Sequence, residues 1–420
     1  MTTNSWLGGL PSLPPDTAWP RNAETGLPQH FLAQVDCADL PTLGGTSPLP
    51  REGLLLFFSD LDEERLSDSH TVVHVPKARQ SVPPRALPDD LPEIDHSGGN
   101  PNSYNDAPGQ RSYPKWPVIP TAVQIWAGED TSLPKAHQRD YRERARAAHD
   151  ASLAAVMPPP VESERLADVF PTRQRKDAEG KTILTPEGKA IPYTVFDPSA
   201  LPDGFPFCGA GIDAFVTRLQ QQATKAARRA TSERSLIDAK WNDTEEKRVR
   251  KQAEADQADD HARTLAAFAK EAREVLGTLP ALAPVPQDRL TRLHGWLAGL
   301  VDRTRYQQQE VQTALTRSLL DLARASVTDP DLAARLPASL YAAHLTSLLP
   351  SPRHSQHLML GPAQTKTNST EGSGIRLLCL DSDYGPGMMF CDGGVIEYWI
   401  APEDLAALRF DRVRAETAGG

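Results

Sequence analysis

The sequence has few cysteines and no long hydrophobic run. Its four cysteines, at positions 37, 208, 379 and 391, never form a Cys-x-x-Cys pair, so we expect reduced thiols and no metal site. No stretch approaches the roughly 18 consecutive apolar residues of a membrane-spanning helix. Met1 is followed by polar residues and a Gly- and Pro-rich loop, so we expect no signal peptide. The expected location is the cytoplasm, with no membrane partner.

Positive charge and familiar catalytic motifs are also scarce. The net charge is −10, and no basic stripe with interleaved aromatic residues occurs, so nucleic acid is not an expected partner. The chain has no Gly-x-Ser-x-Gly elbow, no P-loop and no His-Glu-x-x-His pair. Gly8-Gly9 neither follows a strand nor opens a helix, so it is no dinucleotide fingerprint. These absences favour binding over catalysis, and we expect no cofactor.

Proline separates regions of different character. Twenty-eight of the 38 prolines precede Phe207, and none lies between Phe207 and Leu279. Residues 212–276 contain neither Pro nor Gly and mix 13 basic with 12 acidic residues, which is typical of solvated helix. A single helix of this length would reach roughly 100 Å at 1.5 Å per residue, so a bent pair or helical hairpin is expected. The simplest interpretation is a solvated insertion, and the alternative is a partner-binding arm.

Further helices are predicted on both sides of this block. Leucines recur at spacings of three and four over 290–300, after Asp288 as a candidate N-cap, and again over 311–322. Both stripes are typical of helices that pack into a core. Residues 135–155 read as a solvated helix. Pro402 and the acidic residues after it predict a short closing helix over 403–410.

Short apolar runs predict strands near both ends of the chain. They cover residues 31–35, 54–58, 70–76, 121–130, 375–380 and 395–400. Residues 173–197 contain two Gly-containing turns and read as a hairpin or meander. A long Pro-rich connector is expected within 76–120.

Several of these segments resemble one family. The first motifs are LGGLPSLPPDTAWP, GLPQHFLAQVDCADLP and LPREGLLLFFSD, and the later ones are HLMLGPAQT, LLCLDSDYG and MMFCDGGVIEYWIAPEDLAALRF. Their order resembles the YwqG-like or DUF1963 proteins over about residues 5–75 and 354–413. The family commonly has Trp-Gly-Asp where this chain has Phe390-Cys391-Asp392, so only Asp392 and Gly394 carry over.

The resemblance implies an α+β fold with antiparallel strands, and no catalytic residues. Some members are encoded near bacterial toxin genes, which implies an immunity or interaction role. The motif order also suggests an internal duplication, because each half reads as Gly and Pro, then Gln, an apolar strand, Asp, Gly and a second strand. We therefore expect antiparallel sheets from the N- and C-terminal segments. Residues 1–206 with 351–420 would form one discontinuous domain, and 207–350 a helical insertion.

Candidate binding residues lie at the strand ends and in the opening loop. They are Trp19, Gln34, Asp36, Gln364, Asp381, Asp383, Asp392 and Gly394. Clustered carboxylates can divide into an acid and a base, and Asp381-Ser382-Asp383 resembles the start of a calcium loop. Ordinary turn chemistry is the preferred explanation for each Asp, and packing onto the sheet is preferred for Trp19.

A histidine pair, one cysteine and two glutamines are further candidates for a site. His354 and His357 are three residues apart, as in some metal sites, but they read better as a surface pair. Cys208, in a Gly-rich turn before the helical block, reads as a small apolar residue rather than a nucleophile. Gln34 and Gln364 occupy equivalent-looking repeat positions.

The sequence as a whole predicts a non-catalytic protein-binding module. Its most concrete form is an immunity-like inhibitor of a toxin or effector, with self-association through the helical insertion as a further possibility. The alternative is a small-ligand- or metal-binding protein, or a hydrolase-like enzyme that uses the clustered Asp residues.

Overall fold

The structure is a computed structural model of the chain, and it divides into two compact units. Unit 1 comprises Met1–Val161 and Thr346–Gly420, and unit 2 comprises Glu162–Leu345. The structure describes residues 3–41, 48–61, 69–77, 82–94, 110–122, 147, 167–238, 244–337, 340, 357–360, 374–383, 385–390 and 393–418. The strand predicted over 121–130, except its first two residues, and the helix predicted over 135–155, except residue 147, lie outside these residues.

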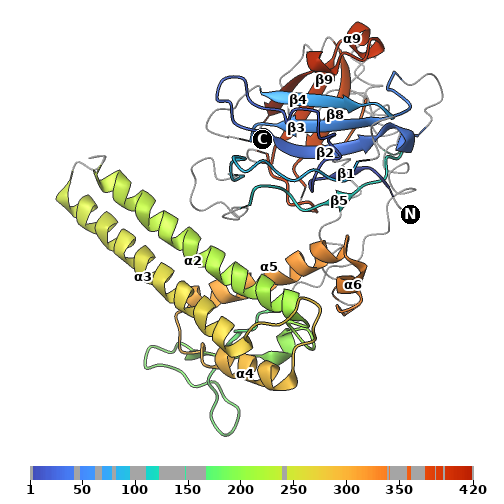
Figure 1. The fold of residues 1–420 in the computed structure, drawn as a ribbon. Coiled ribbons are helices and arrows are strands. Elements are labelled where there is room, and N and C mark those ends of the chain that lie inside the picture. Colours follow the sequence, from blue (N-terminus) through green and yellow to red (C-terminus); the bar gives the residue numbers. More distant parts are fainter. Residues whose placement is uncertain are drawn as a thin grey trace. The chain divides into compact units, whose positions relative to one another are not determined.

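Unit 1 contains a five-stranded antiparallel sheet from the N-terminal segment, in the order β4-β3-β2-β1-β5 (Figure 1). Its strands are β1 (Trp6–Leu7), β2 (His30–Asp36), β3 (Leu54–Ser59), β4 (His70–Val75) and β5 (Trp116–Pro117). A short 3-10 helix, η1 (Cys37–Asp39), follows β2. Both faces of β3 are buried, which explains its continuous apolar run.

The C-terminal segment contributes a three-stranded antiparallel sheet to the same unit, in the order β10-β9-β8. Its strands are β8 (Ile375–Asp381), β9 (Val395–Ile400) and β10 (Arg414–Ala418). Between β9 and β10 lie α9 (Pro402–Ala406) and the 3-10 helix η5 (Phe410–Arg412). The predicted closing helix is therefore too long: it ends early, and Leu408 takes a left-handed φ of 55°. The expected α+β fold, with sheets from both ends of the chain, is confirmed.

The two sheets repeat one pattern of pairing. β2 and β8 each have seven residues, and β3 and β9 each have six. The register shifts after the second residue of the first strand in both pairs, between Phe31 and Ala33 and between Arg376 and Leu378. This register makes Asp36 the counterpart of Asp381, and Gln34 the counterpart of Cys379.

Loop hydrogen bonds repeat as well. The N–H of Cys37 donates to the carbonyl of Gly53 at 2.9 Å, and the N–H of Ser382 donates to the carbonyl of Gly394 at 3.1 Å. Each bond joins the residue after one strand to the residue before the next. Leu358 forms an antiparallel bridge with Cys379 in the second sheet, and Trp6 pairs in the same way with Gln34 in the first. The two end segments are thus two copies of one structural unit.

Residues in equivalent positions of the two copies also touch each other. The register makes Phe57 the counterpart of Tyr398, and their ring centroids lie 5.1 Å apart. The Tyr398 hydroxyl donates to the carbonyl of Phe58 at 3.2 Å. A residue that contacts its own counterpart is the mark of a two-fold relation. The opposite face of β3 packs on the opening loop through Phe58 and Trp19.

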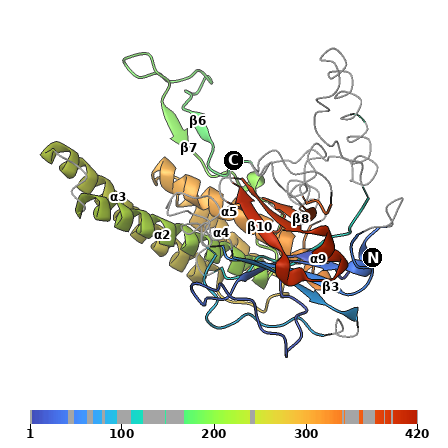
Figure 2. The same ribbon diagram turned by 90° about the horizontal axis from the view of Figure 1, so that it is seen from above.

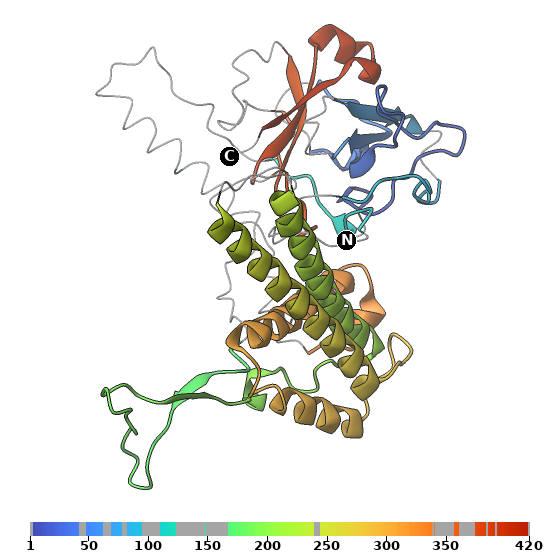
Figure 3. The ribbon, with the colours of Figure 1, turned by 90° about the vertical axis from the view of Figure 1, so that its left-hand side faces the viewer.

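Unit 2 is helical. Its helices are α2 (Gly209–Asp238), α3 (Glu245–Leu276), α4 (Gln287–Ala298), α5 (Arg305–Ser326) and α6 (Pro330–Ala333). α2 and α3 form an antiparallel hairpin that α5 crosses near its base (Figure 3), in keeping with the sequence prediction. The predicted N-cap of α4 is wrong: Pro286 holds that position, and Asp288 pairs within the helix with Arg292 at 3.2 Å.

The core of unit 2 lies at the base of the hairpin. Phe215 of α2 and Phe268 of α3 are buried there against leucines of α4 and α5. Farther out, the two helices meet through small residues such as Ala230 and Ala255, which are fully buried. The hairpin is therefore a packed helical domain at its base and a narrow two-helix arm beyond it.

Residues before the helical block also belong to this core. Val169, Phe170, Leu201 and Phe205 are buried in it, which places the start of unit 2 earlier in the chain than the expected boundary at 206. The predicted hairpin over 173–197 contains β6 (Thr172–Gln174) and β7 (Pro192–Thr194), and it extends away from the helices of its unit (Figure 2). The 3-10 helix η3 (Pro198–Ala200) follows. None of the helices described is both long enough and apolar enough to cross a membrane.

Candidate functional site

Trp19, a sequence candidate, lies in the core of unit 1. Its side chain is 6% exposed, its Nε1 donates to the carbonyl of Gln29 at 2.9 Å, and its ring meets Phe58 edge-on at 5.5 Å. All of its surface is thus engaged within the fold. The structure places Trp19 as a packing residue that fixes the opening loop on β3.

Asp36 ends β2 and is 3% exposed. One carboxylate oxygen accepts the N–H of Ala38 at 2.9 Å, and the other accepts from the Asn4 amide at 3.3 Å. Its own N–H donates to the Ser5 hydroxyl at 3.0 Å. This carboxylate caps η1 and ties the N-terminal residues to the strand end, which is the turn role that the sequence analysis preferred.

Asp383 and His357 form a pair in the second copy. His357 Nε2 lies 2.9 Å from Asp383 Oδ2, and His357 Nδ1 accepts the N–H of Asp381 at 3.3 Å. Because Nδ1 accepts a hydrogen bond, this nitrogen carries no proton, and the ring donates from Nε2 to the carboxylate. A general base needs a free lone pair, and the lone pair of His357 Nδ1 already accepts a backbone N–H. The second oxygen of Asp383 accepts the N–H of Gly385 at 2.8 Å.

The other candidates divide between turn residues and positions outside the described chain. Gly394 accepts from both the backbone and the hydroxyl of Ser382 in the turn before β9. Gln364, Asp392 and His354 lie outside the described residues. The strand register makes Cys379, not Gln364, the counterpart of Gln34.

The described cysteines are buried. Desolvation, reinforced by nearby carboxylates, raises the pKa of Cys37 and that of Cys379 to about 12, so both are uncharged thiols at neutral pH. Cys208 is fully buried just before α2, in the packing role that its sequence context favours. Within the described part of the chain, no three His, Cys, Asp or Glu side chains gather as a metal site would require.

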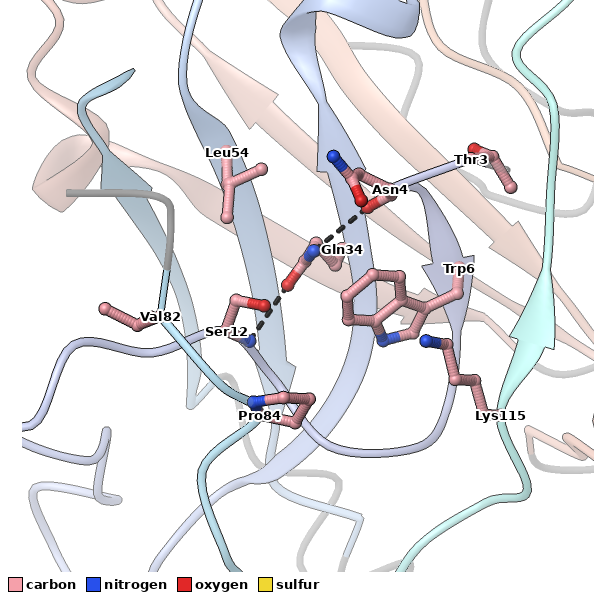
Figure 4. Close-up of a pocket in the computed structure, with 9 residues that line it drawn as sticks. All are labelled: Thr3, Asn4, Trp6, Ser12, Gln34, Leu54, Val82, Pro84 and Lys115. Carbon is pink, nitrogen blue, oxygen red and sulfur yellow. Dashed lines mark hydrogen bonds between the residues drawn. The ribbon is translucent and has the colours of Figure 1, made fainter. Parts of the chain in front are cut away.

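A pocket does open beside Gln34, on the first copy (Figure 4). Its volume is about 380 Å³, within the range of small-molecule sites. The described residues that line it are Thr3, Asn4, Trp6, Ser12, Gln34, Leu54, Val82, Pro84 and Lys115. Leu54, Val82 and Pro84 supply an apolar side, while Trp6 and Lys115 lie across from Leu54 and Val82.

Gln34 holds together the backbone segments that line this pocket. Its Oε1 accepts the N–H of Ser12 at 2.9 Å, and its Nε2 donates to the carbonyl of Asn4 at 2.9 Å (Figure 4). Both ends of a side chain that is 1% exposed thus hold the two segments that flank β1. Gln34 belongs to the candidate site, as its sequence position suggested, but as a residue that positions the walls.

Trp6 and Lys115 form one wall. Trp6 is 5% exposed, and its Nε1 has no hydrogen-bond partner in the described part of the chain. The Lys115 ammonium lies 3.8 Å from the centroid of the Trp6 ring, a cation–π distance. Burial lowers the pKa of Lys115 from its ordinary value. The wall therefore presents a positive charge at Lys115, with the Trp6 N–H buried beside it.

The second copy fills the same place with apolar side chains. The counterparts of Trp6, Gln34 and Leu54 are Leu358, Cys379 and Val395, and those three residues pack together as a buried hydrophobic cluster. At these three described positions, the second copy thus has only apolar side chains, whereas the first copy has the amide of Gln34 and the indole of Trp6.

Comparison with known protein families shows to which family the chain belongs. The sequence model of a family described as "Domain of unknown function (DUF1963)" matches residues 5–418. The chain belongs to the DUF1963 family. The match spans nearly the whole chain, including the helical region, to which the motif resemblance did not extend. No curated protein matches the chain.

Of the nine described residues that line this pocket of the DUF1963 protein, the sequence analysis named only Gln34 as a candidate. Trp6 and Ser12 lie in the opening loop, from which only Trp19 was named, and Lys115 lay in the predicted Pro-rich connector. One signal was available in Gly8-Gly9, which has φ values of 59° and 68°. A Cβ on Gly9 would lie 2.8 Å from the Cβ of Lys115, so the glycine lets the lysine segment approach β1.

Proposed function

We propose that this DUF1963 protein is a non-catalytic binding protein that holds a small ligand in the pocket beside Gln34. The observation that carries the proposal is the difference between the two copies at one place in the fold. Where the second copy has Leu358, Cys379 and Val395 in a buried apolar cluster, the first copy has a pocket of about 380 Å³. Gln34 uses its polar ends to hold the backbone of the walls, and the Lys115 ammonium beside them forms no ion pair with a described residue, which points to a ligand.

The absence of catalysis is supported by how the candidate acids and bases are used. The carboxylates of Asp36 and Asp383 accept backbone N–H groups, and His357 Nδ1 does the same. A catalytic base needs a lone pair within reach of a substrate proton. These side chains instead hold the turns at the strand ends.

The test is a thermal-shift screen of small molecules on two variants of the full chain. Val82→Trp places a large ring at the pocket wall, whereas Ile119→Trp adds the same ring at a site of the same unit that is 62% exposed and does not line the pocket. A true ligand at 100 times its Kd stabilises the fold by about 2.7 kcal/mol. The expected hit stabilises wild type and Ile119→Trp but not Val82→Trp. Hits that stabilise all three proteins equally would contradict the proposal.

A second candidate function is the binding of another protein, with immunity to a toxin or effector as its concrete form. The arm of unit 2 favours it. Outside the base, α2 and α3 are charged and joined by ion pairs such as Lys251–Glu233 at 2.9 Å, and Val249 is 61% exposed. Both signs of charge are interspersed along the helices, which suits a mixed protein surface better than nucleic acid.

This second function is tested by charge reversal on the arm. Arg250→Glu changes a side chain that is 67% exposed, and Tyr193→Asp alters the exposed β7 ribbon of the same unit as a control. A toxin or effector encoded beside the protein should be inhibited by wild type and by Tyr193→Asp, and less well by Arg250→Glu. Equal inhibition by all three proteins, or by none, would contradict this assignment. Light scattering of the same proteins tests self-association through the arm.

A further inference from the structure

We infer that the pocket recognises a small carboxylate, whose anionic group lies against Lys115 and Trp6 and whose apolar body lies against Leu54, Val82 and Pro84. The inference rests on the proposed small-ligand function and specifies its chemistry. Free acids up to the size of the pocket are the ligand class.

The first argument is the unpartnered indole of Trp6. The side chain is 5% exposed, and no described residue accepts a hydrogen bond from its Nε1. A buried donor left without a partner costs about 1–3 kcal/mol, so such groups are rare unless something else satisfies them. Trp19 illustrates the usual outcome, because its Nε1 donates to a carbonyl. The nitrogen itself is covered in this structure, so a ligand oxygen supplies the missing acceptor only when the groups over it move aside.

The second argument is the ammonium of Lys115. No carboxylate among the described residues forms an ion pair with it, and its closest described partner is the face of the Trp6 ring at 3.8 Å. Desolvation lowers the pKa of this lysine, and an anion beside it would raise that pKa again. Lysine and an indole N–H together are donors without an acceptor, which is the complement of a carboxylate.

The position of Lys115 is built by the backbone. β1 pairs with β5, and the Leu7–Trp116 register sets Lys115 beside β1. The N–H of Gly9 donates to the carbonyl of Tyr113 at 2.8 Å, and Gly9 carries no Cβ that would collide with Lys115. The lysine is thus anchored at its backbone, although its side chain is long.

Negative charge on one side of the pocket sets the orientation of the bound ligand. Asp36 accepts from Asn4, and Asp39 accepts from the Thr3 hydroxyl at 3.0 Å, so the Thr3–Asn4 side of the pocket is backed by two carboxylates. An anion is disfavoured on that side and favoured at Lys115. The Ser12 hydroxyl, near the middle of the pocket (Figure 4), is a further donor for the ligand.

The experiment follows the Trp6 indole signal of the ¹⁵N-labelled full chain by NMR, with Trp6→Phe assigning the signal. Benzoate and its uncharged isostere benzamide are the probes. Benzoate is expected to shift the Trp6 signal in a saturable way and to bind about tenfold or more tightly than benzamide, a difference of about 1.4 kcal/mol. Lys115→Met should remove that preference, whereas Lys77→Met should keep it, because Lys77 pairs with Glu52 and does not line the pocket.

The outcomes separate the two levels of the proposal. If benzamide binds as tightly as benzoate to wild type, the carboxylate inference is overturned and small-ligand binding stands. If neither probe shifts the Trp6 signal up to its solubility limit, the carboxylate inference is overturned, and the screen on Val82→Trp decides the proposed function by itself. A benzoate preference that survives in Lys115→Met would also overturn the inference.

Discussion

Two tryptophans of the opening loop have opposite roles at the scale of single residues. Trp19 uses both its ring and its N–H within the fold, while Trp6 packs its ring and leaves its N–H unpaired. Both are almost fully buried, so exposure alone would not distinguish them. The hydrogen-bond partners make the difference: Trp19 has an acceptor for its N–H, and Trp6 has none among the described residues.

Trp19→Ala is expected to destabilise the protein strongly. Removing this buried ring loses its contact with Phe58 and leaves a cavity, at a cost of about 3–5 kcal/mol in the free energy of unfolding. Urea denaturation measures the change, with Leu27→Ala as the control because Leu27 is 41% exposed. Similar unfolding midpoints for the two variants would show that Trp19 is not a core residue.

His30 should make unit 1 sensitive to acid. Burial lowers its pKa from 6.5, against smaller opposing effects of the Pro92 carbonyl and Asp60, while Arg111 lowers it further. Below about pH 6.5, His30 is therefore protonated more readily in the unfolded chain than in the folded chain. The free energy of unfolding falls as pH drops through this range, by at most about 1.4 kcal/mol per pH unit for this group. Urea midpoints at pH 7.5 and 5.5 should differ less in His30→Gln than in wild type. An equal difference in both proteins would remove His30 as the cause.

At the scale of elements, the two copies share a backbone but differ inside. Phe31 and Leu56 of the first sheet correspond to Arg376 and Glu397 of the second. Those two charged side chains are fully buried and joined by a hydrogen bond of 2.7 Å. An apolar contact in one copy is thus an ion pair in the other, at the same place beside the same bulge.

Exchanging this pair tests whether the copies are interchangeable at that place. Arg376→Met should cost about 3–5 kcal/mol, because it takes the guanidinium away from a fully buried carboxylate. The double variant Arg376→Phe with Glu397→Leu, which installs the residues of the first copy, should recover most of that loss. Chemical denaturation of the three proteins measures it. A double variant less stable than Arg376→Met would mean that the two interiors have diverged beyond exchange.

The elements were the most predictable part of this molecule. Apolar runs located β2, β3, β8 and β9, and the block without Pro and Gly located the α2–α3 hairpin. The short strands β1 and β5 gave no such signal, because two-residue strands have no periodicity to detect. These two elements position Trp6 and Lys115, so of the residues that line the pocket the sequence analysis named only Gln34 as a candidate. Its other walls depend on pairings between residues far apart in the chain.

At the scale of the whole molecule, the repeat of one structural unit at both ends of the chain explains why these ends belong to one compact unit. Unit 1 takes both ends of the chain, and unit 2 is formed by the segment between them. The sequence analysis expected this order, but it placed residues 162–206 with the ends. Their turns and hairpin resemble β structure locally, whereas Phe170 and Phe205 are buried in the helical core. Local pattern does not reveal which core a buried side chain joins.

Separate cores predict separate unfolding transitions. Phe57 is fully buried in unit 1 and Phe215 in unit 2, and replacing either with Ala should cost about 3–5 kcal/mol within its own unit. Scanning calorimetry of the full chain should therefore show two transitions. Phe57→Ala should lower the temperature of one, and Phe215→Ala that of the other. If a single transition moves equally in both variants, the units unfold as one cooperative body, and a ligand in the unit 1 pocket would then stabilise the helices as well.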